Sequence, residues 1–421
     1  MKVRILSKIK INPISLILLT IVVMGLMGIP FAYFFDKKGY FYHFAYKLTD
    51  ENSILISYLY TLYGFIVMFF LYYGLGLKRK INTYINKETI RFTKKHYELL
   101  WHASFALAFI CFTFVFIQAG GMHPALAALK SDYSGIKVLR HSISLMVNMN
   151  IYNIGFKFFL PFNLIVALFF LKKRLFTLIS LLLFALMSTF VLEKGPIVSV
   201  IILIVFFGML TSEIPFRKLF QYGLISMFLI SVMYFLTRFA TSISTLFKGI
   251  SERIFYGQIS DLPYYFELFS KDKAPFSTLL PPYLANLLGQ GGIKSASRLV
   301  MEFSNPEAVS QGTAGVANTF FIGEAYAVAG HIGAILSPFI VMANLTLLVY
   351  LLSAWKKNIF FVFLYAWFLF KTFEGTFGGI SYFTFSGLHI ILLCLFYYLL
   401  SYTFVENVKK LKKNRNIKQT M

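Results

Sequence analysis

Residues 331–353 read HIGAILSPFIVMANLTLLVYLLS, a continuous apolar run with no Asp, Glu, Lys or Arg. A helix of this length can cross the hydrocarbon core of a bilayer. Similar runs recur along the chain, at 13–35, 53–76, 98–118, 151–171, 175–191, 196–212, 217–237, 358–373 and 384–404. The sequence therefore predicts an all-α polytopic membrane protein, a single integral membrane domain over 1–421 with about ten transmembrane helices.

The composition supports this fold class and excludes an ordinary soluble one. Hydrophobic residues make up 58% of the 421-residue chain and charged residues 14%, whereas soluble domains average about 25% charged residues. Cys111 and Cys394 both fall inside apolar runs, which leaves no disulfide framework and no paired-cysteine metal site. The basic first residues precede an apolar run too long for a signal-peptide core, so we interpret 13–35 as the first span.

The Lys and Arg residues predict the orientation of the bundle. If the spans alternate, most of these residues fall on one side, in 1–10, 78–95, 172–174, 217–218, 356–357 and 409–418. Such loops face the cytoplasm, so both termini are predicted to be cytoplasmic. Because this asymmetry explains the net charge of +23, we expect no nucleic-acid partner. The other side holds a smaller extracytoplasmic loop, 119–150, and a large one, 238–310, and loops of the latter length are usually functional.

Several kinds of chemistry are excluded by missing motifs. The chain has no phosphate-binding G-x-x-x-x-G-K-[ST], no H-E-x-x-H, no D-x-D and no G-x-S-x-G. A nucleotide-driven pump, a zinc hydrolase and a serine hydrolase are therefore unsupported. We expect any reaction to run at the outer face without a metal or other cofactor.

Several Lys and Arg residues fall on the extracytoplasmic side, which should be poor in them. The guanidinium group binds phosphate oxygens in pairs and does not lose its charge. A rival interpretation for any single arginine is contact with lipid headgroups, and Arg298 with Glu302 also has the i, i+4 spacing of an exposed helix pair. The candidate anion-binding residues are Arg140, Lys194, Arg238, Arg253 and Arg298.

The segment 311–335, QGTAGVANTFFIGEAYAVAGHIGAI, is small and apolar but contains Glu324 and His331. Its glycines and alanines allow close helix packing in lipid. Glu324 and His331 are seven residues apart, so on a continuous helix they would share a face. Ionisable groups at membrane depth are costly and tend to be functional. Glu324 is the candidate general base with His331 beside it, and Glu374 is a further candidate; the alternative is a structural role at the interface.

The chain resembles the O-antigen polymerase family, also called oligosaccharide repeat unit polymerases, which are bacterial inner-membrane glycosyltransferases of the GT-C-like class. The resemblance rests on the helix number, the EKGP turn at 193–196, the long loop after a span that ends in Arg238, and NTFFIGEAYAVAGHIG at 318–333. The spacing from Arg238 to Gly249 resembles an arginine pattern of some members.

The resemblance implies a reaction in which a glycan on undecaprenyl pyrophosphate is transferred to a new lipid-linked repeat unit. Arg238 and Arg253 would bind the pyrophosphate, Arg140, Lys194 and Arg298 would assist, and Glu324 would act as base. The implied partners are the lipid-linked oligosaccharide, membrane lipid and a chain-length regulator. Some loop aromatics are candidates to stack on sugar rings, with packing in the protein as the alternative for most of them; the candidates are Tyr264, Tyr265, Phe266 and Tyr283.

Three alternatives remain open at this point. An O-antigen ligase shares the donor and the architecture but transfers to the lipid A core. A flippase or other transporter would place charges along a path through the membrane, for which Lys157 and Lys371 are the basic candidates within spans. An outer-facing acyltransferase would need an entry site for an activated acyl group, for which the sequence shows no signature.

Overall fold

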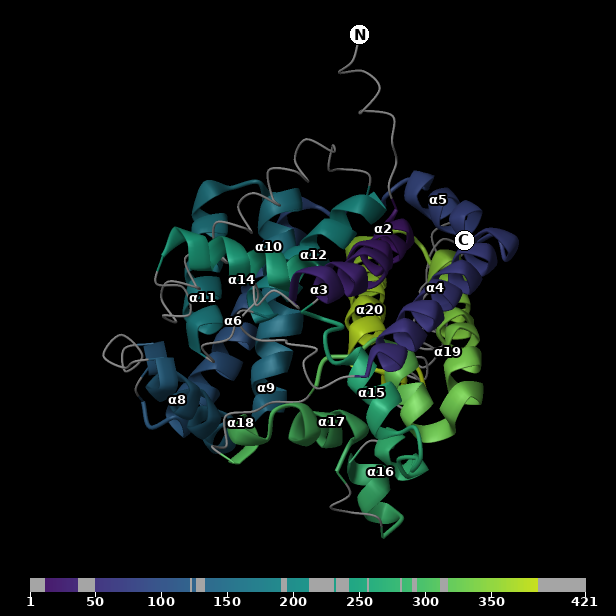
Figure 1. The fold of residues 1–421 in the computed structure, drawn as a ribbon. Helices are drawn as coiled ribbons and strands as arrows, with labels where there is room; N and C mark the ends of the chain where they lie inside the picture. The colour runs from purple at the N-terminus through teal and green to yellow at the C-terminus, as the bar shows by residue number, and fades with distance from the viewer. Residues whose placement is uncertain are drawn as a thin grey trace.

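The computed structural model describes residues 12–36, 50–121, 123–125, 133–190, 195–211, 231, 242–255, 257–280, 282–289, 294–310 and 317–384. Over these ranges the chain is all-α, and the one β pairing is an isolated bridge between Ile90 and Asn358. The helices form a bundle with short helices gathered along one edge (Figure 1). The predicted all-α class is confirmed for this part of the chain.

The helices occur in the following order. The first part contains α2 (Pro13–Thr20), η1 (Ile21–Met27), α3 (Gly28–Asp36), α4 (Glu51–Gly74), α5 (Leu77–Asn86), α6 (Lys94–Gln118), α8 (Tyr133–Met146), α9 (Met149–Ile154), η3 (Gly155–Phe159), α10 (Leu160–Ile165), η4 (Val166–Leu171), α11 (Arg174–Phe190) and α12 (Gly195–Thr211). The second part contains α14 (Ile243–Phe255), α15 (Leu262–Leu268), η5 (Phe276–Leu279), α16 (Pro282–Leu287), α17 (Ala296–Ser304), α18 (Pro306–Ser310), α19 (Phe321–Ala354), α20 (Ile359–Gly378) and η6 (Ile380–Tyr382). The elements η1, η3 and η4 are π-helical and η5 and η6 are 3-10 turns.

Six of the described helices are long and apolar enough to cross a membrane: Pro13–Phe31, Glu51–Gly74, Lys94–Gln118, Met149–Leu171, Phe321–Ala354 and Ile359–Gly378. Two shorter apolar helices, Arg174–Phe190 and Ile197–Thr211, coincide with two more of the predicted spans. The predicted spans 217–237 and 384–404 lie almost entirely outside the described residues.

Helix starts follow ordinary capping chemistry. Asn12 precedes Pro13, and its side-chain oxygen accepts the backbone N–H of Ser15 at 3.0 Å. Asn358 caps α20 in the same way by accepting the N–H of Phe361 at 3.1 Å. Asparagine at the N-cap satisfies an otherwise unpaired backbone N–H, and proline suits the first helical turn. These residues set where the first and last of the described spans begin.

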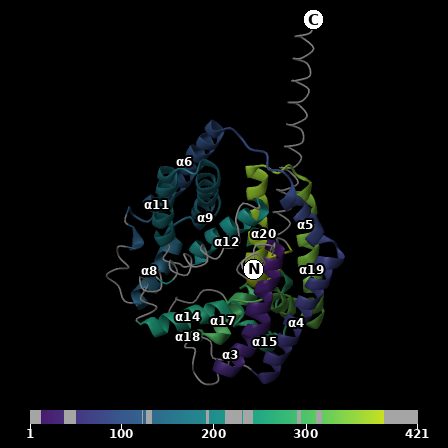
Figure 2. The ribbon, with the colours of Figure 1, turned by 90° about the horizontal axis from the view of Figure 1, so that it is seen from above.

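The spans run between two distinguishable ends. One end, which we call the basic end, brings together the connections 75–98, 172–174 and 355–358. There the Lys357 ammonium donates to the carbonyl oxygens of Ile85 at 2.6 Å and Lys87 at 3.0 Å. At the opposite end, the N–H of Asn148 donates to Gln118 at 2.8 Å, joining the start of α9 to the end of α6. Figures 1 and 2 show α8, α15, α17 and α18 together at this second end.

Buried polar side chains join helices in the half of the bundle around α6. Asn163 of α10 is fully buried and donates to the Trp101 carbonyl oxygen at 2.7 Å. Its own carbonyl accepts the Ser180 hydroxyl of α11 at 2.6 Å, and Trp101 donates its indole N–H to Ser180 at 2.9 Å. In lipid, such hydrogen bonds between helices add to the packing of small and apolar side chains. They hold α6, α10 and α11 in register.

The segment predicted as the large loop is partly built into the core. Helix α15 packs between α4 and α19. Its Tyr264, Tyr265 and Phe266 are 6%, 0% and 2% exposed. These rings are enclosed by protein and pack within the core, which is the alternative that the sequence left open for them. The Tyr283 side chain lies outside the described residues.

Helix α19 bends sharply at Gly330. This residue has φ 61° and ψ −146°, which no helix contains, and three residues later a side chain on Gly333 would overlap the carbonyl oxygen of Ala325. The helix begins at Phe321, ten residues before the predicted span, and the bend divides it. The expectation that Glu324 and His331 share one face of a continuous helix is therefore wrong.

We expect Gly330→Ala to lower the stability of the protein by about 1–3 kcal/mol, the usual cost of holding a side-chain-bearing residue in a conformation open only to glycine. The measurement is the thermal midpoint of the detergent-solubilised protein. Gly74→Ala is the matched control, because a Cβ there meets no atom within 4 Å and its φ is ordinary. Equal midpoints for the two variants would contradict the strain at Gly330.

Candidate functional site

Glu324 lies in the first turn of α19 and is 4% exposed. Its Oε2 accepts the backbone N–H of Ser381 at 2.8 Å. The chain after α20 passes directly against this carboxylate, because a Cβ on Gly379 would overlap Oε2. Gly379 has φ 124°, a conformation that favours glycine. The glycines at the end of α20 thus allow the backbone to enclose and bind the carboxylate.

A second polar group lies on the α15 side of Glu324. Tyr265 is fully buried, and burial raises its pKa well above the ordinary value, with the negative charges of Glu324 and Asp261 adding to the effect. Asp261 is 4% exposed and accepts the backbone N–H of Asn318 at 2.8 Å. The phenol therefore stays protonated.

Three charged side chains from within the spans also meet. Glu374 of α20 accepts from the Lys371 ammonium at 2.5 Å through Oε2, and its Oε1 lies 4.0 Å from the ammonium of Lys157 in η3. The Ser199 hydroxyl of α12 donates to the same Oε1 at 3.3 Å. We call these four residues the in-span cluster. It joins three helices that are far apart in the sequence.

Tyr382 is influenced by both the in-span cluster and Glu324. Loss of water around its hydroxyl raises its pKa, and the charges of Glu374 and Glu324 raise it further. Tyr382 lies in η6, next to Ser381, whose N–H holds Glu324. Tyr382 also approaches Gly375 and Gly378 closely, so η6 contacts both the end of α20 that carries Glu374 and the carboxylate of Glu324.

The predicted anion-binding residues are only partly described. Lys194 and Arg238 lie outside the described residues. Arg140 lies on α8 and Arg253 on α14, and only the backbone of each is described. Arg298 is the one member of the set whose side-chain contacts are described.

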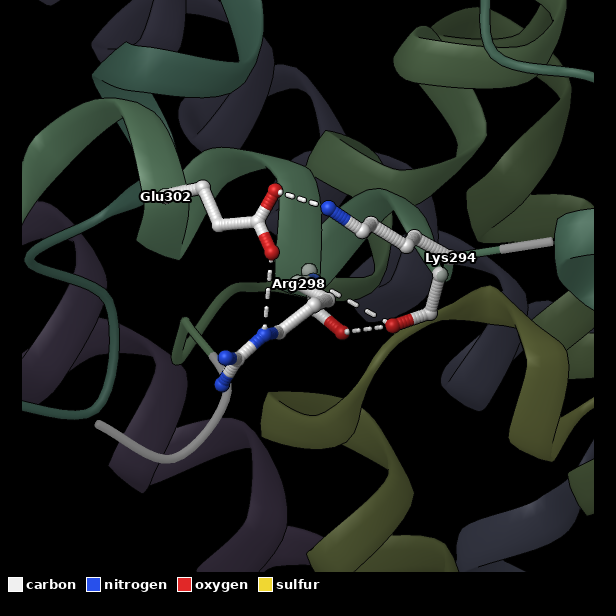
Figure 3. A network of polar contacts seen from close by, with 5 residues as sticks. Lys294, Arg298 and Glu302 are labelled. Atoms are coloured by element: carbon white, nitrogen blue, oxygen red, sulfur yellow. Dashed lines mark hydrogen bonds and ion pairs between the residues drawn. The ribbon is translucent and has the colours of Figure 1, made fainter. Parts of the chain in front are cut away.

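Arg298 is engaged by a carboxylate. Figure 3 shows Glu302 between Lys294 and Arg298, with Oε2 2.8 Å from the Lys294 ammonium and Oε1 3.3 Å from Nε of Arg298. The hydrogen bond from Lys294 is the largest cause that lowers the pKa of Glu302. The ion pair between Arg298 and Glu302, which their i, i+4 spacing suggested, is therefore present. Pyrophosphate binding by Arg298 stays a prediction.

We expect Arg298→Gln to change the free energy of unfolding by less than about 1 kcal/mol, because ion pairs open to water contribute little. Denaturant titration of the purified protein measures this. A loss of several kcal/mol would instead make Arg298 a structural anchor of α17, and an effect on polymer length could not then be assigned to binding.

His331 lies apart from the contacts of Glu324. Its Nδ1 is 2.7 Å from the Tyr60 hydroxyl of α4, and its ring packs 5.3 Å from that of Tyr326. The Tyr60 ring is stacked on Phe266 at 5.6 Å. His331 therefore joins α4 to α19 at the bend. No described contact links it to Glu324, so its predicted role beside the base stays a prediction.

Sequence reasoning named Glu324, Glu374, Lys157 and Lys371 singly but did not bring any of them together. Nothing in the local sequence of Lys157 indicates a partner more than two hundred residues away. The backbone contact of Ser381 and the close approach of Gly379 were also missed. The glycine-rich run GTFGGIS at 375–381 was a usable signal, because clustered glycines after an apolar span indicate close backbone approach.

Helix length and hydropathy define the chain as a multi-pass helical membrane protein. No family model, no curated protein and no solved structure matches the chain.

Proposed function

We propose that this chain is a polymerase that joins oligosaccharide repeat units linked to undecaprenyl pyrophosphate, giving O-antigen or capsular polysaccharide at the outer face of the bacterial inner membrane. The observation that carries the proposal is Glu324, a carboxylate that is 4% exposed at the start of a span and accepts the backbone N–H of Ser381. Such a group can remove a proton from a sugar hydroxyl.

The proposed orientation places the Glu324 end outside. The basic end contains α5 and the lysine-rich connections 87–95, 172–174 and 356–357. Loops of this kind stay in the cytoplasm, so the termini are cytoplasmic and α15, α17 and α18 face outward. The two spans expected beyond the described helices would complete a GT-C-like bundle of about ten.

In the proposed reaction, Glu324 takes the proton of the acceptor hydroxyl while that oxygen attacks C1 of the sugar at the reducing end of the growing chain. The bond from C1 to the pyrophosphate oxygen breaks, and undecaprenyl pyrophosphate leaves with the bonding electrons. Cations stabilise the charge that develops on the leaving group. Arg238 and Arg253 would bind it, with Arg140, Lys194 and Arg298 assisting, and a chain-length regulator is the expected protein partner.

The proposal is tested with the full-length protein in nanodiscs and lipid-linked repeat units extracted from a strain that lacks it. Mass spectrometry of the product should show glycans of two or more repeats and released undecaprenyl pyrophosphate. Unchanged repeat units in the presence of folded protein would overturn the proposal.

A transporter is the second candidate, and the in-span cluster is the observation that favours it. Lys157, Lys371 and Glu374 lie within spans, and charges at that depth often mark a transport path. Transfer of the same lipid-linked units between the leaflets of a proteoliposome, without any change in glycan length, would support this alternative.

A further inference from the structure

We propose that Lys157 and Lys371 form an anion-binding site of the phosphate type, in which Glu374 serves as an internal counter-ion until a ligand arrives. The polymerase proposal supplies only the identity of the ligand, the diphosphate headgroup of a polyprenyl lipid.

The geometry shows that the two ammonium groups can share one oxyanion. Lys371 contacts one oxygen of the Glu374 carboxylate and Lys157 lies near the other, at 2.5 and 4.0 Å. The Ser199 hydroxyl donates to the second oxygen at 3.3 Å. A diphosphate offers the same pair of anionic oxygens to the same three donors, with more charge.

The cluster is open to a ligand. Among its described contacts, two lysines meet one carboxylate. The side chains of Lys157, Lys371 and Glu374 are 27%, 20% and 23% exposed, so the cluster is not sealed within protein. A ligand can reach groups that are exposed to this degree.

The backbone at Lys157 is a second, independent observation. Lys157 lies in η3, a π-helical segment within the long helix Met149–Leu171. Segments of this kind occur frequently at functional sites, and η1 and η4 are π-helical as well.

The cluster also lies where the proposed chemistry needs an anion. Glu374 directly precedes Gly375, which Tyr382 of η6 approaches closely, and Ser381 of the same turn donates its N–H to Glu324. A diphosphate bound by Lys157 and Lys371 would therefore lie close to η6, the turn that holds Glu324. Lys371 also lies 5.7 Å from the ring centres of Trp367 and Phe370, apolar neighbours suited to a lipid ligand.

The test measures binding to the full-length protein in phosphatidylcholine nanodiscs, with farnesyl diphosphate and inorganic pyrophosphate as probes. Lys157→Gln and Lys371→Gln should each weaken farnesyl diphosphate binding at least tenfold. Glu374→Gln should strengthen it, because the competing carboxylate is removed, whereas a structural ion network would be weakened by the same change. Lys173→Gln is the matched control, since Lys173 pairs with Glu98 at 2.8 Å at the basic end, and should leave binding unchanged.

The outcomes separate the site from the function. If inorganic pyrophosphate binds as tightly as farnesyl diphosphate, and both depend on Lys157 and Lys371, the site is supported with a free anion as its ligand. Tighter binding of farnesyl diphosphate supports a lipid ligand. No binding of either probe, or binding that ignores Lys157 and Lys371, overturns the proposal. If binding follows these lysines but no glycan is extended, the polymerase function fails while the anion site stands.

Discussion

Glu324→Gln should slow glycan extension about 10²- to 10⁴-fold, the usual contribution of a general base. The change removes the base but keeps the shape of the side chain, and the amide oxygen can still accept the N–H of Ser381 that Glu324 accepts at 2.8 Å. The measurement is the rate of chain extension by purified protein, normalised to the folded fraction.

Glu98→Gln is the control for this experiment. Glu98 is also a carboxylate of a span and pairs with Lys173 at 2.8 Å, but it lies at the basic end. Its replacement should leave the rate within about twofold of wild type, far below the contribution of a general base. If both variants retained full activity, Glu324 would be a structural residue and the proposed mechanism would need another base.

Gly379→Ala should also abolish extension and should lower stability by about 1–3 kcal/mol. The new methyl group would overlap the Glu324 carboxylate, and the backbone at φ 124° favours glycine. The carboxylate must then move away from Ser381 or the turn must open. Extension rate and thermal midpoint, measured on the same preparation, report these two effects separately.

Gly76→Ala is the control that separates the effect of backbone strain from the effect of displacing the Glu324 carboxylate. Gly76 has φ 66°, and a Cβ there meets no atom within 4 Å. This variant should lose stability without losing activity. An active Gly379→Ala protein would show that the close approach to Glu324 is not needed for function.

Hydropathy predicted most of the described spans because each span must be apolar over a fixed length. The same reasoning could not find α15, whose aromatic run is too short to be distinguished from a loop. It also placed the start of α19 ten residues too late, since the Gly330 bend joins a short buried segment to the main helix. Bends and inserted short helices depend on tertiary packing, which periodicity does not report.

The candidate site was predictable only as separate residues. Glu324 was found because a carboxylate in a small, apolar segment is unusual. The prediction that Glu324 and His331 share one helix face was wrong, because the backbone leaves the helical conformation at Gly330, between the two residues. The meeting of Lys157 with Glu374 depends on how η3 packs against α12 and α20, and this information lies in no local stretch of sequence.

The most direct test of the polymerase proposal is the polysaccharide ladder of a strain that lacks this chain. We expect single-repeat products in that strain, long chains when wild type is restored, and single repeats again with Glu324→Gln. Long polymer that accumulates unattached would identify a ligase, and the absence of any repeat unit at the outer face would identify a transporter; either result would contradict the proposed function.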